Sequence, residues 1–258
     1  MDKSKIVVLI LSTSDKRYSS FKKAIEESWA RNLREKGVKC FYYQGGAQKN
    51  EIKENTIFLT ANDDLKHTSV KLLEAFKLVL DSYPETQLVY RTNLSSFIEA
   101  QNFLKFISRH DLNSDTYCGT KNKTNTTREN FYLNELMTFV FTVLQFFGKK
   151  FYFASGSGFF IGVNNIIKII DDPKKLNYVD DVMIGYNLID QPIKLIPKRF
   201  DIKEHNKHKI PLNEYNGLID KDLLFHYRFK TKNRSNDSKN LKQFKNPNFR
   251  IEFCSFKS

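Results

Sequence analysis

The chain has 258 residues, of which 40% are hydrophobic and 28% are charged, a composition that is typical of a globular protein and excludes a disordered one. Its formal net charge of +13 favours an anionic partner, which could be a nucleic acid, a phosphorylated small molecule or an acidic surface. Three widely separated cysteines exclude a disulfide framework and a zinc site, and they indicate a reducing compartment.

The first half of the chain alternates between predicted strands and helices. Residues 5–11 (KIVVLIL) form a continuous apolar run, which is typical of a parallel strand buried on both faces. The apolar run is too short for a membrane span or a signal peptide. Further strands are predicted at 38–45, 56–61, 87–93 and 115–120. Helices are predicted around Phe21 to Trp29 and over 64–82 and 97–108. This alternation predicts an α/β fold of Rossmann type, a single domain whose mostly parallel sheet is flanked by helices.

The second half of the chain is less regular. Residues 121–130 predict a flexible loop, and the apolar stretch 131–148 predicts either a buried helix or a pair of strands. A short helix is expected over 166–172 and a strand over 193–202. We predict one domain over residues 1–230, followed by a basic and loosely ordered C-terminal extension over 231–258.

Two neighbouring segments carry the clearest functional signal. In FYFASGSGFFIG (151–162), Gly156 and Gly158 let the backbone approach a flat ligand such as a sugar ring. In YVDDVMIGYNL (178–188), Asp180 and Asp181 precede an apolar run at helical spacing, where a carboxylate can serve as a general base. The alternative is structural, with Asp180 capping a helix and the glycines forming a β-bulge.

Six segments, taken in chain order, match motifs of one enzyme family. They are FKKAIEESW (21–29), DDLKHTSVKLL (63–73), YRTNLSSF (90–97), FASGSGFFIG (153–162), VDDVMIG (179–185) and LLFHYR (223–228). Together they resemble the fringe and β-1,3-galactosyltransferase family of inverting GT-A-fold enzymes, which use UDP-sugars. The resemblance covers roughly residues 5–230. It implies a GT-A-like fold, a nucleotide-sugar donor and an oligosaccharide or glycan acceptor.

The resemblance also implies roles for individual residues. Asp181 aligns with the catalytic base, and Asp180 beside it would either raise the pKa of Asp181 or cap the helix. By analogy Asp63 would bind uracil or ribose, and its alternative role is a helix N-cap. The residues expected to contact the donor are Thr13, Arg17, Asp63, Lys71, Arg91, Thr92, Asn93, Ser95, His226, Arg228 and Lys230. The residues expected to contact the acceptor are Ser155, Gly156, Ser157 and Gly158.

The chain departs from the family at its metal motif. Where the family has consecutive aspartates, this chain has Asn93, Leu94 and Ser95. Because Mn²⁺ and Mg²⁺ prefer anionic oxygen ligands, we expect no metal cofactor, and Mn²⁺ or Mg²⁺ stays the alternative. A departing nucleoside diphosphate still needs positive charge nearby. The segment from His226 through Arg228 and Lys230 can supply it, and the alternative is a solvated basic strand.

Three functions are compatible with these patterns. The first is a metal-independent inverting glycosyltransferase that moves a sugar from a nucleotide-sugar, UDP-linked by resemblance, to a carbohydrate hydroxyl. The second is a catalytically inactive protein on the same fold that binds a sugar or a nucleotide. The third is a nucleic-acid-binding protein, but its aromatic residues lie in apolar runs and are not interleaved with Lys and Arg, so we expect no nucleic-acid partner. The absence of a predicted membrane anchor and the few cysteines favour a bacterial or viral enzyme in the cytoplasm.

Overall fold

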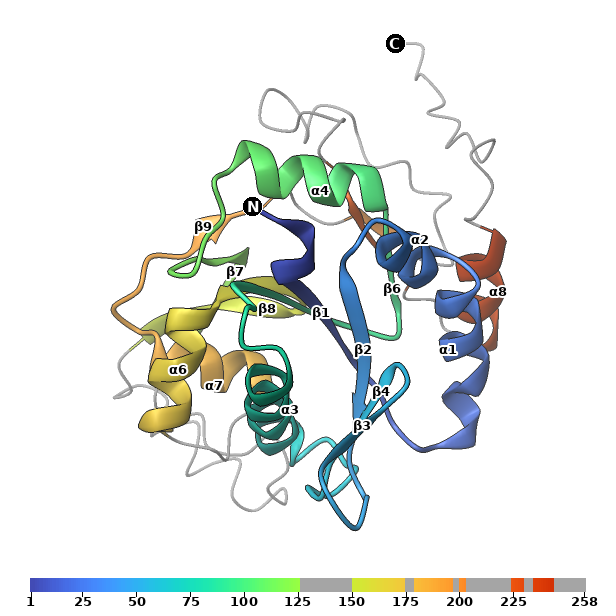
Figure 1. Ribbon diagram of the computed structural model, residues 1–258, viewed down its shortest axis with the longest axis horizontal. Coiled ribbons are helices and arrows are strands. Elements are labelled where there is room, and N and C mark those ends of the chain that lie inside the picture. Colours follow the sequence, from blue (N-terminus) through green and yellow to red (C-terminus); the bar gives the residue numbers. More distant parts are fainter. Residues whose placement is uncertain (126–149, 175–178, 197–199, 203–223, 230–233, 244–258) are drawn as a thin grey trace. The chain divides into compact units, whose positions relative to one another are not determined.

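The computed structural model describes residues 1–125, 150–174, 179–196, 200–202, 224–229 and 234–243 (Figure 1). The apolar stretch 131–148 lies outside these residues. The chain groups into two compact units, and the first consists of Met1–Ser14, Lys39–Asn93 and Leu112–Ile196. The second unit consists of Asp15–Val38, Leu94–Asp111 and Pro197–Ser258.

The first unit is built on a large mixed sheet, in which the described strands have the order β3-β4-β2-β1-β5-β8-β7-β9. These strands are β1 (Ile6–Leu11), β2 (Lys39–Gln44), β3 (Glu51–Lys53), β4 (Thr56–Phe58), β5 (Leu88–Asn93), β7 (Tyr117–Asn125), β8 (Lys150–Gly162) and β9 (Lys194–Leu195). β1 pairs in parallel with β2 and β5, and β2 pairs in parallel with β4. β8 runs antiparallel to both β5 and β7. The predicted α/β fold with a mostly parallel sheet is therefore confirmed.

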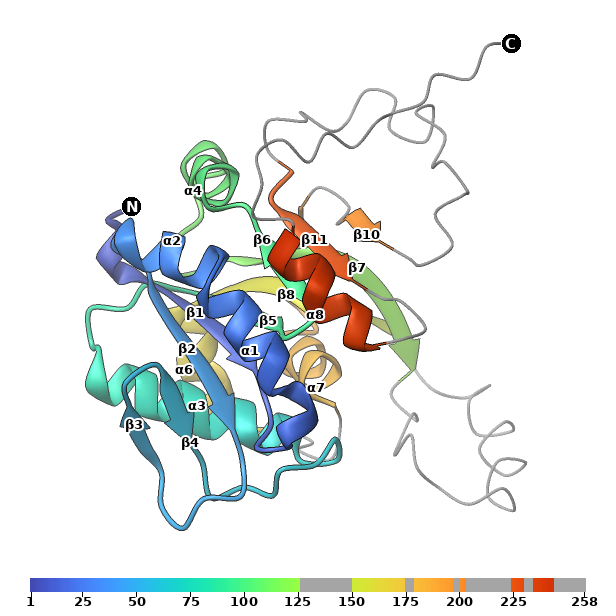
Figure 2. The ribbon, with the colours of Figure 1, turned by 90° about the vertical axis from the view of Figure 1, so that its right-hand side faces the viewer.

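One face of the large sheet carries three helices of the same unit (Figures 1 and 2). They are α3 (Thr68–Ser82), α6 (Val163–Asp171) and α7 (Asp180–Asn187). A single hydrophobic cluster joins them to the strands and includes Leu9 on β1, Phe76 on α3 and Ile184 on α7. On the opposite face of β1, Val8 and Ile10 are also completely buried. The prediction that this strand is buried on both faces is thus confirmed.

The second unit contains helices and a small sheet in the order β10-β11-β6. Its described elements are η2 (Lys16–Tyr18), α1 (Ser19–Glu26), α2 (Trp29–Glu35), β6 (Ser96–Ile98), α4 (Ala100–Arg109), β10 (Phe200–Ile202), β11 (His226–Phe229) and α8 (Arg234–Gln243). Trp29 is fully buried, and its indole N–H donates to the Ser96 carbonyl oxygen at 2.9 Å, which ties α2 to β6. This contact gives the single tryptophan a core role.

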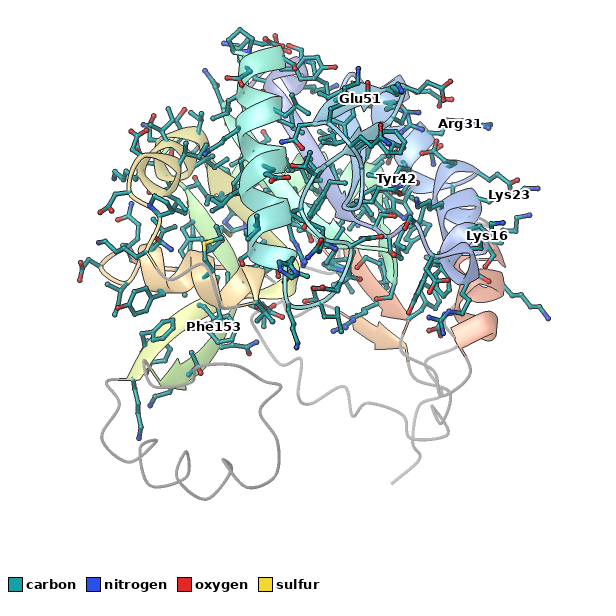
Figure 3. The ribbon with its side chains drawn as sticks, turned by 90° about the horizontal axis from the view of Figure 1, so that it is seen from below. Lys16, Lys23, Arg31, Tyr42, Glu51 and Phe153 are labelled. Atoms are coloured by element: carbon teal, nitrogen blue, oxygen red, sulfur yellow. The ribbon has the colours of Figure 1, made fainter. Side chains whose placement is uncertain are left out.

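Several boundaries differ from the sequence-based expectations because of contacts distant in the sequence. Residues 121–125 continue β7, although a loop was expected, because they pair with the start of β8. There Phe151 and Phe153 are buried, and Phe153 (labelled in Figure 3) packs under Gly185 of α7. The helix expected from residue 97 begins at Ala100, because Ser96–Ile98 pairs with β11 as a strand. Residues 234–243 form α8, which packs against α1, where a loosely ordered tail was expected.

Candidate active site

The parallel strands β1, β2 and β5 end at one edge of the large sheet, and two clusters of charged residues lie at this edge. Because β8 is antiparallel to β5, with Gly158 opposite Thr92, residues 155–157 of β8 lie at the same edge. Helices α3 and α7 also begin there, and the backbone N–H of Asp180 donates to the Thr68 hydroxyl at 3.4 Å. Ligands of open α/β sheets bind beyond this edge.

Asp63 is the centre of the first cluster and ties together the loops that follow β1 and β2. Its Oδ2 accepts hydrogen bonds from the Thr13 hydroxyl at 2.8 Å, and from the Ser14 backbone N–H at 2.7 Å and hydroxyl at 2.9 Å. Its Oδ1 accepts from the Gly45 N–H at 3.3 Å and from Lys71 Nζ at 3.0 Å. A carboxylate has about four lone-pair sites, so these donors saturate it. Asp63 therefore fixes the loops of this edge.

The ion pair between Lys71 and Asp63 is largely excluded from water, since the two side chains are 4% and 10% exposed. Burial acts to raise the pKa of Asp63, but the hydrogen bonds from Ser14, Thr13 and Lys71 outweigh it and lower that pKa to about 2. Asp63 is consequently ionised at neutral pH. Helix α3 begins at Thr68, so the alternative role of Asp63 as its N-cap does not apply.

The second cluster is a closed triangle of buried groups formed by Arg91 on β5, Tyr43 on β2 and Asp180 on α7. The Arg91 guanidinium pairs with the Asp180 carboxylate through Nη2, and its Nε donates to the Tyr43 hydroxyl oxygen at 3.1 Å. That hydroxyl in turn donates to Asp180 Oδ2 at 3.4 Å. The Arg91 and Asp180 side chains are 3% and 6% exposed. Because breaking a buried pair costs about 3–5 kcal/mol, this arrangement is held firmly.

Asp181 differs from its neighbour in that it is partly exposed. Its Oδ2 accepts a hydrogen bond from the Gly156 N–H at 2.6 Å, and its Oδ1 accepts from the Val182 N–H at 2.9 Å. Burial, and after it the adjacent charge of Asp180, raise the pKa of Asp181 to about 6, against the opposing effects of the Gly156 N–H and Arg91. A carboxylate with this pKa can exchange its proton near neutral pH, as general acid–base chemistry requires.

Gly156 leaves the space that these charged groups occupy. A Cβ atom at this position would lie 2.9 Å from Asp181 Oδ2 and 3.0 Å from Arg91 Nη1. Real Cβ atoms are almost never this close to a neighbour, so only glycine fits without displacement of Asp181 or Arg91. The sequence predicted that this glycine admits a sugar ring, and the structure places a carboxylate and a guanidinium against it.

The other predicted residues of the first unit also lie at this strand end. The Thr92 hydroxyl donates to the Ser157 carbonyl oxygen at 2.9 Å, and Asn93 Nδ2 donates to the Gly156 carbonyl oxygen at 3.4 Å. The hydroxyls of Ser155 and Ser157 are 3.1 Å apart, and both residues are buried. These contacts join the ends of β5 and β8 beside Asp181.

Four predicted donor residues belong to the second unit, and Lys230 lies outside the described residues. Arg17 is exposed and pairs with Asp15 at 2.6 Å. The Ser95 carbonyl oxygen accepts from the Phe229 N–H, and His226 Nε2 lies 2.9 Å from the Ser96 hydroxyl. Arg228 lies on β11 opposite Ser96. A role in donor binding stays a prediction for Arg17, Ser95, His226 and Arg228.

Sequence reasoning missed Tyr43 and Gly45. Tyr43 lies in the buried strand predicted at 38–45. A buried phenol hydroxyl needs a hydrogen-bond partner, and this need was the signal from which its role could have been inferred.

Among the described residues, no three side chains of His, Cys, Asp or Glu gather in a way that could hold a metal ion.

The charged side chains at the carboxyl edge of this α/β sheet, with the raised pKa of Asp181 among them, mark a candidate active site. The model of the galactosyltransferase family matches residues 46–199, and the chain belongs to this family. The protein is therefore a glycosyltransferase, which confirms the predicted family resemblance.

Comparison with solved structures gave matches of low sequence identity. One is a glycosyltransferase involved in the glycosylation of the major capsid of PBCV-1, with a TM-score of 0.48, 8% identity, and coverage of 92% of this chain and 98% of that one. Another is the galactosyltransferase LgtC in complex with donor and acceptor sugar analogues, with a TM-score of 0.44, 11% identity, and coverage of 92% and 95%. A search of curated protein sequences gave no match. Among the described helices, none has the length and apolar character needed to cross a membrane.

Proposed function

We propose that this glycosyltransferase inverts the anomeric centre and moves a sugar from a UDP-linked donor to a carbohydrate hydroxyl without a metal ion. The observation that carries the proposal is the state of Asp181. This carboxylate is partly exposed, is aimed by the Gly156 N–H at 2.6 Å, and has a pKa raised to about 6. It can accept a proton at neutral pH and is accessible to a substrate.

The reaction that fits one available carboxylate is a single displacement. The acceptor oxygen forms a bond to the anomeric carbon while its proton passes to Asp181. The bond from that carbon to the diphosphate oxygen breaks, and its electron pair leaves with the nucleoside diphosphate. Attack and departure on opposite faces invert the configuration. Asp180 is paired with Arg91 and buried, so it is not available as a covalent nucleophile for a retaining reaction.

The residues at the family's metal-binding positions do not fit a divalent cation. The Asn93 amide offers one neutral oxygen and donates through its nitrogen to the Gly156 carbonyl oxygen, while Leu94 is apolar and buried. Mn²⁺ and Mg²⁺ prefer several anionic oxygens. The charge on the departing diphosphate would then be met by cationic side chains, and the candidates that the sequence offers are His226, Arg228 and Lys230.

The proposal includes a nucleotide-sugar donor, an oligosaccharide or glycan acceptor, no nucleic-acid partner and a location in bacterial or virus-infected host cytoplasm. The buried cysteines Cys40 and Cys118 are free thiols, which supports a reducing compartment.

The alternative function is an inactive binding protein on the same fold. Such a protein would keep the donor site but would not turn the donor over.

The experiment is a thermal-unfolding screen with UDP, UDP-galactose, UDP-glucose, UDP-N-acetylglucosamine and GDP-mannose, each with EDTA and with Mn²⁺. A ligand at 100 times its Kd adds about 2.7 kcal/mol, which for a domain of this size shifts Tm by about 5–10 °C. We expect a shift with one UDP-sugar that EDTA leaves unchanged, and an inverted product in an NMR transfer assay. A shift that requires Mn²⁺, or a retained configuration, would contradict the proposal.

A further inference from the structure

Among the described residues, Arg91 is a cation that lies near both Asp180 and Asp181, and it is paired only with Asp180. Arg91 Nη2 binds the Asp180 carboxylate, whereas Arg91 Nη1 and Asp181 Oδ2 flank the Cα hydrogen of Gly156. The Cβ position of Gly156 is 3.0 Å from Nη1 and 2.9 Å from Oδ2. These two atoms are therefore no more than about 6 Å apart, a separation at which charges interact strongly. A modest rotation of the guanidinium would bring it to the other carboxylate.

The Tyr43 hydroxyl fixes the orientation of the guanidinium. It accepts from Arg91 Nε at 3.1 Å and donates to Asp180 Oδ2 at 3.4 Å. A guanidinium is planar, so two contacts, at Nε and at Nη2, determine the direction of the whole fork. Tyr43 is completely buried, and burial raises the pKa of its phenol above the usual value, so the hydroxyl keeps the proton that it donates.

We propose that Tyr43 is a positioning residue that holds the Arg91 cation on Asp180. Asp181 is thereby left as the carboxylate that accepts the substrate proton, a role that rests on the proposed function. Two adjacent aspartates then have different tasks. Asp180 is the fixed partner of Arg91, and its Oδ1 also accepts from the Asp181 N–H at 3.0 Å. Asp181 keeps its Gly156 contact and stays available to the acceptor hydroxyl.

The other groups that the described part of the chain places around Asp181 do not compete for this role. From β7, the Tyr117 hydroxyl accepts from the Ala154 N–H at 2.8 Å, and burial raises its pKa, so it stays neutral. Among the described contacts with β8, Asp181 accepts a hydrogen bond only from the backbone N–H of Gly156. On α3, the buried cation Lys71 is paired with Asp63. Among the described side chains, Arg91 is thus the cation whose position affects the pKa of Asp181, and it acts against the larger effects of burial and of the Asp180 charge.

The test is the variant Tyr43→Phe, which removes only the hydroxyl. Without it, Arg91 Nε loses its acceptor, and the guanidinium, now held by Asp180 alone, can turn its Nη1 toward Asp181. An opposite charge within about 4–6 Å lowers a carboxyl pKa by about 1–3 units, so we expect the acid limb of the kcat/KM profile to move at least one unit lower. The donor Kd is expected to stay unchanged. Tyr42→Phe is the matched control, because Tyr42 (labelled in Figure 3) precedes it on β2 and faces the other side of the sheet.

A second readout does not depend on turnover. The pKa of Asp181 can be followed by NMR through its side-chain carboxyl carbon, in the full chain labelled with ¹³C-aspartate and assigned with Asp181→Asn. We expect the Asp181 titration to move to lower pH in Tyr43→Phe and to stay in place in Tyr42→Phe. A folded Tyr43→Phe protein whose Asp181 titrates at the wild-type pH would overturn the proposal. If the titration moves but wild type transfers no sugar, the proposed function fails and the positioning role stands.

The variant Asp180→Asn gives an independent check. It removes the carboxylate that Tyr43 directs Arg91 toward, so Tyr43→Phe is expected to have no further effect on the Asp181 titration in this background. This non-additivity distinguishes a shared task from two separate structural losses. Equal shifts from Tyr43→Phe in the wild-type and Asp180→Asn backgrounds would show that Tyr43 does not act through Asp180.

Discussion

Replacement of Asp181 by asparagine is expected to stabilise the fold at neutral pH while it removes transfer. Because the pKa of Asp181 is raised from 3.8 to about 6, the folded state binds this proton more tightly than the unfolded state does. The stability gained from that proton is fully present below pH 3.8 and is lost as the pH rises through about 6. Above that pH the wild-type fold holds a charge that its surroundings disfavour, and asparagine has no such charge.

The size of the effect follows from the pKa shift. Because of the shift, the charge on Asp181 lowers the free energy of unfolding of wild type relative to the variant by about 3 kcal/mol at pH 7.5 and by about 1.6 kcal/mol at pH 5. Asparagine can still accept from the Gly156 N–H, but its NH₂ group cannot accept from the Val182 N–H, which costs about 1 kcal/mol. That cost does not depend on pH. The free energy of unfolding of the variant is therefore expected to exceed that of wild type by about 2 kcal/mol at pH 7.5. At pH 5 this advantage is smaller by about 1.4 kcal/mol.

The assay is urea unfolding of wild type and Asp181→Asn at both pH values, with free energies from linear extrapolation. The control is Asp190→Asn, which removes an exposed carboxylate just beyond the end of the same helix. Exposed substitutions usually change stability by less than about 0.5 kcal/mol, so the control should show little change at either pH. A difference between wild type and Asp181→Asn that is equal at the two pH values, or larger at pH 5, would contradict a raised pKa of Asp181 in the folded protein.

Three further predictions concern residues around the site. Gly156→Ala places a methyl group within 3.0 Å of the base carboxylate and the guanidinium, so kcat/KM should fall at least about tenfold with donor Kd little changed, as steady-state kinetics and calorimetry can check. Gly185→Ala places a Cβ 2.2 Å from Phe153 Cβ, and overpacking should cost about 1–3 kcal/mol in urea unfolding, whereas an unchanged midpoint would contradict the close helix–strand contact. Lys71→Met removes the cation from Asp63, so the pKa of Asp63 should rise from about 2 in an NMR titration and the protein should unfold at a higher pH on acidification. An Asp63 titration that stays at its wild-type pH would show that the other donors alone hold the carboxylate.

The parts of the fold that depend on local pattern could be predicted from the sequence. The run KIVVLIL indicated a buried central strand, and β1 is completely or almost completely buried along Ile6 to Ile10. The boundaries that were wrong depend on pairing with distant segments. Residues 121–125 are polar and looked like a loop, but β8 holds them in the sheet. Composition alone does not contain that pairing.

The site shows the same division between local and distant information. The sequence marked Asp180 and Asp181 as a pair at a helix start, which α7 confirms. It did not indicate which of them would be paired with a cation, because Arg91 comes from β5 and Tyr43 from β2. Likewise, Asp63 could be read locally as a helix cap, while its actual partners come from two other loops and α3. Residue roles that depend on tertiary contacts were beyond a single sequence.

The most direct test of the account is release of nucleoside diphosphate from the UDP-sugar that binds, in EDTA, by wild type and by Asp181→Asn. Water serves as the acceptor first, and a panel of oligosaccharides follows. We expect wild type to turn over in EDTA, and Asp181→Asn to bind the donor with the same Kd but react about 10²–10⁴-fold more slowly, the usual contribution of a general base. Full turnover by Asp181→Asn, or wild-type turnover that appears only with Mn²⁺, would contradict a metal-independent transferase with Asp181 as its base.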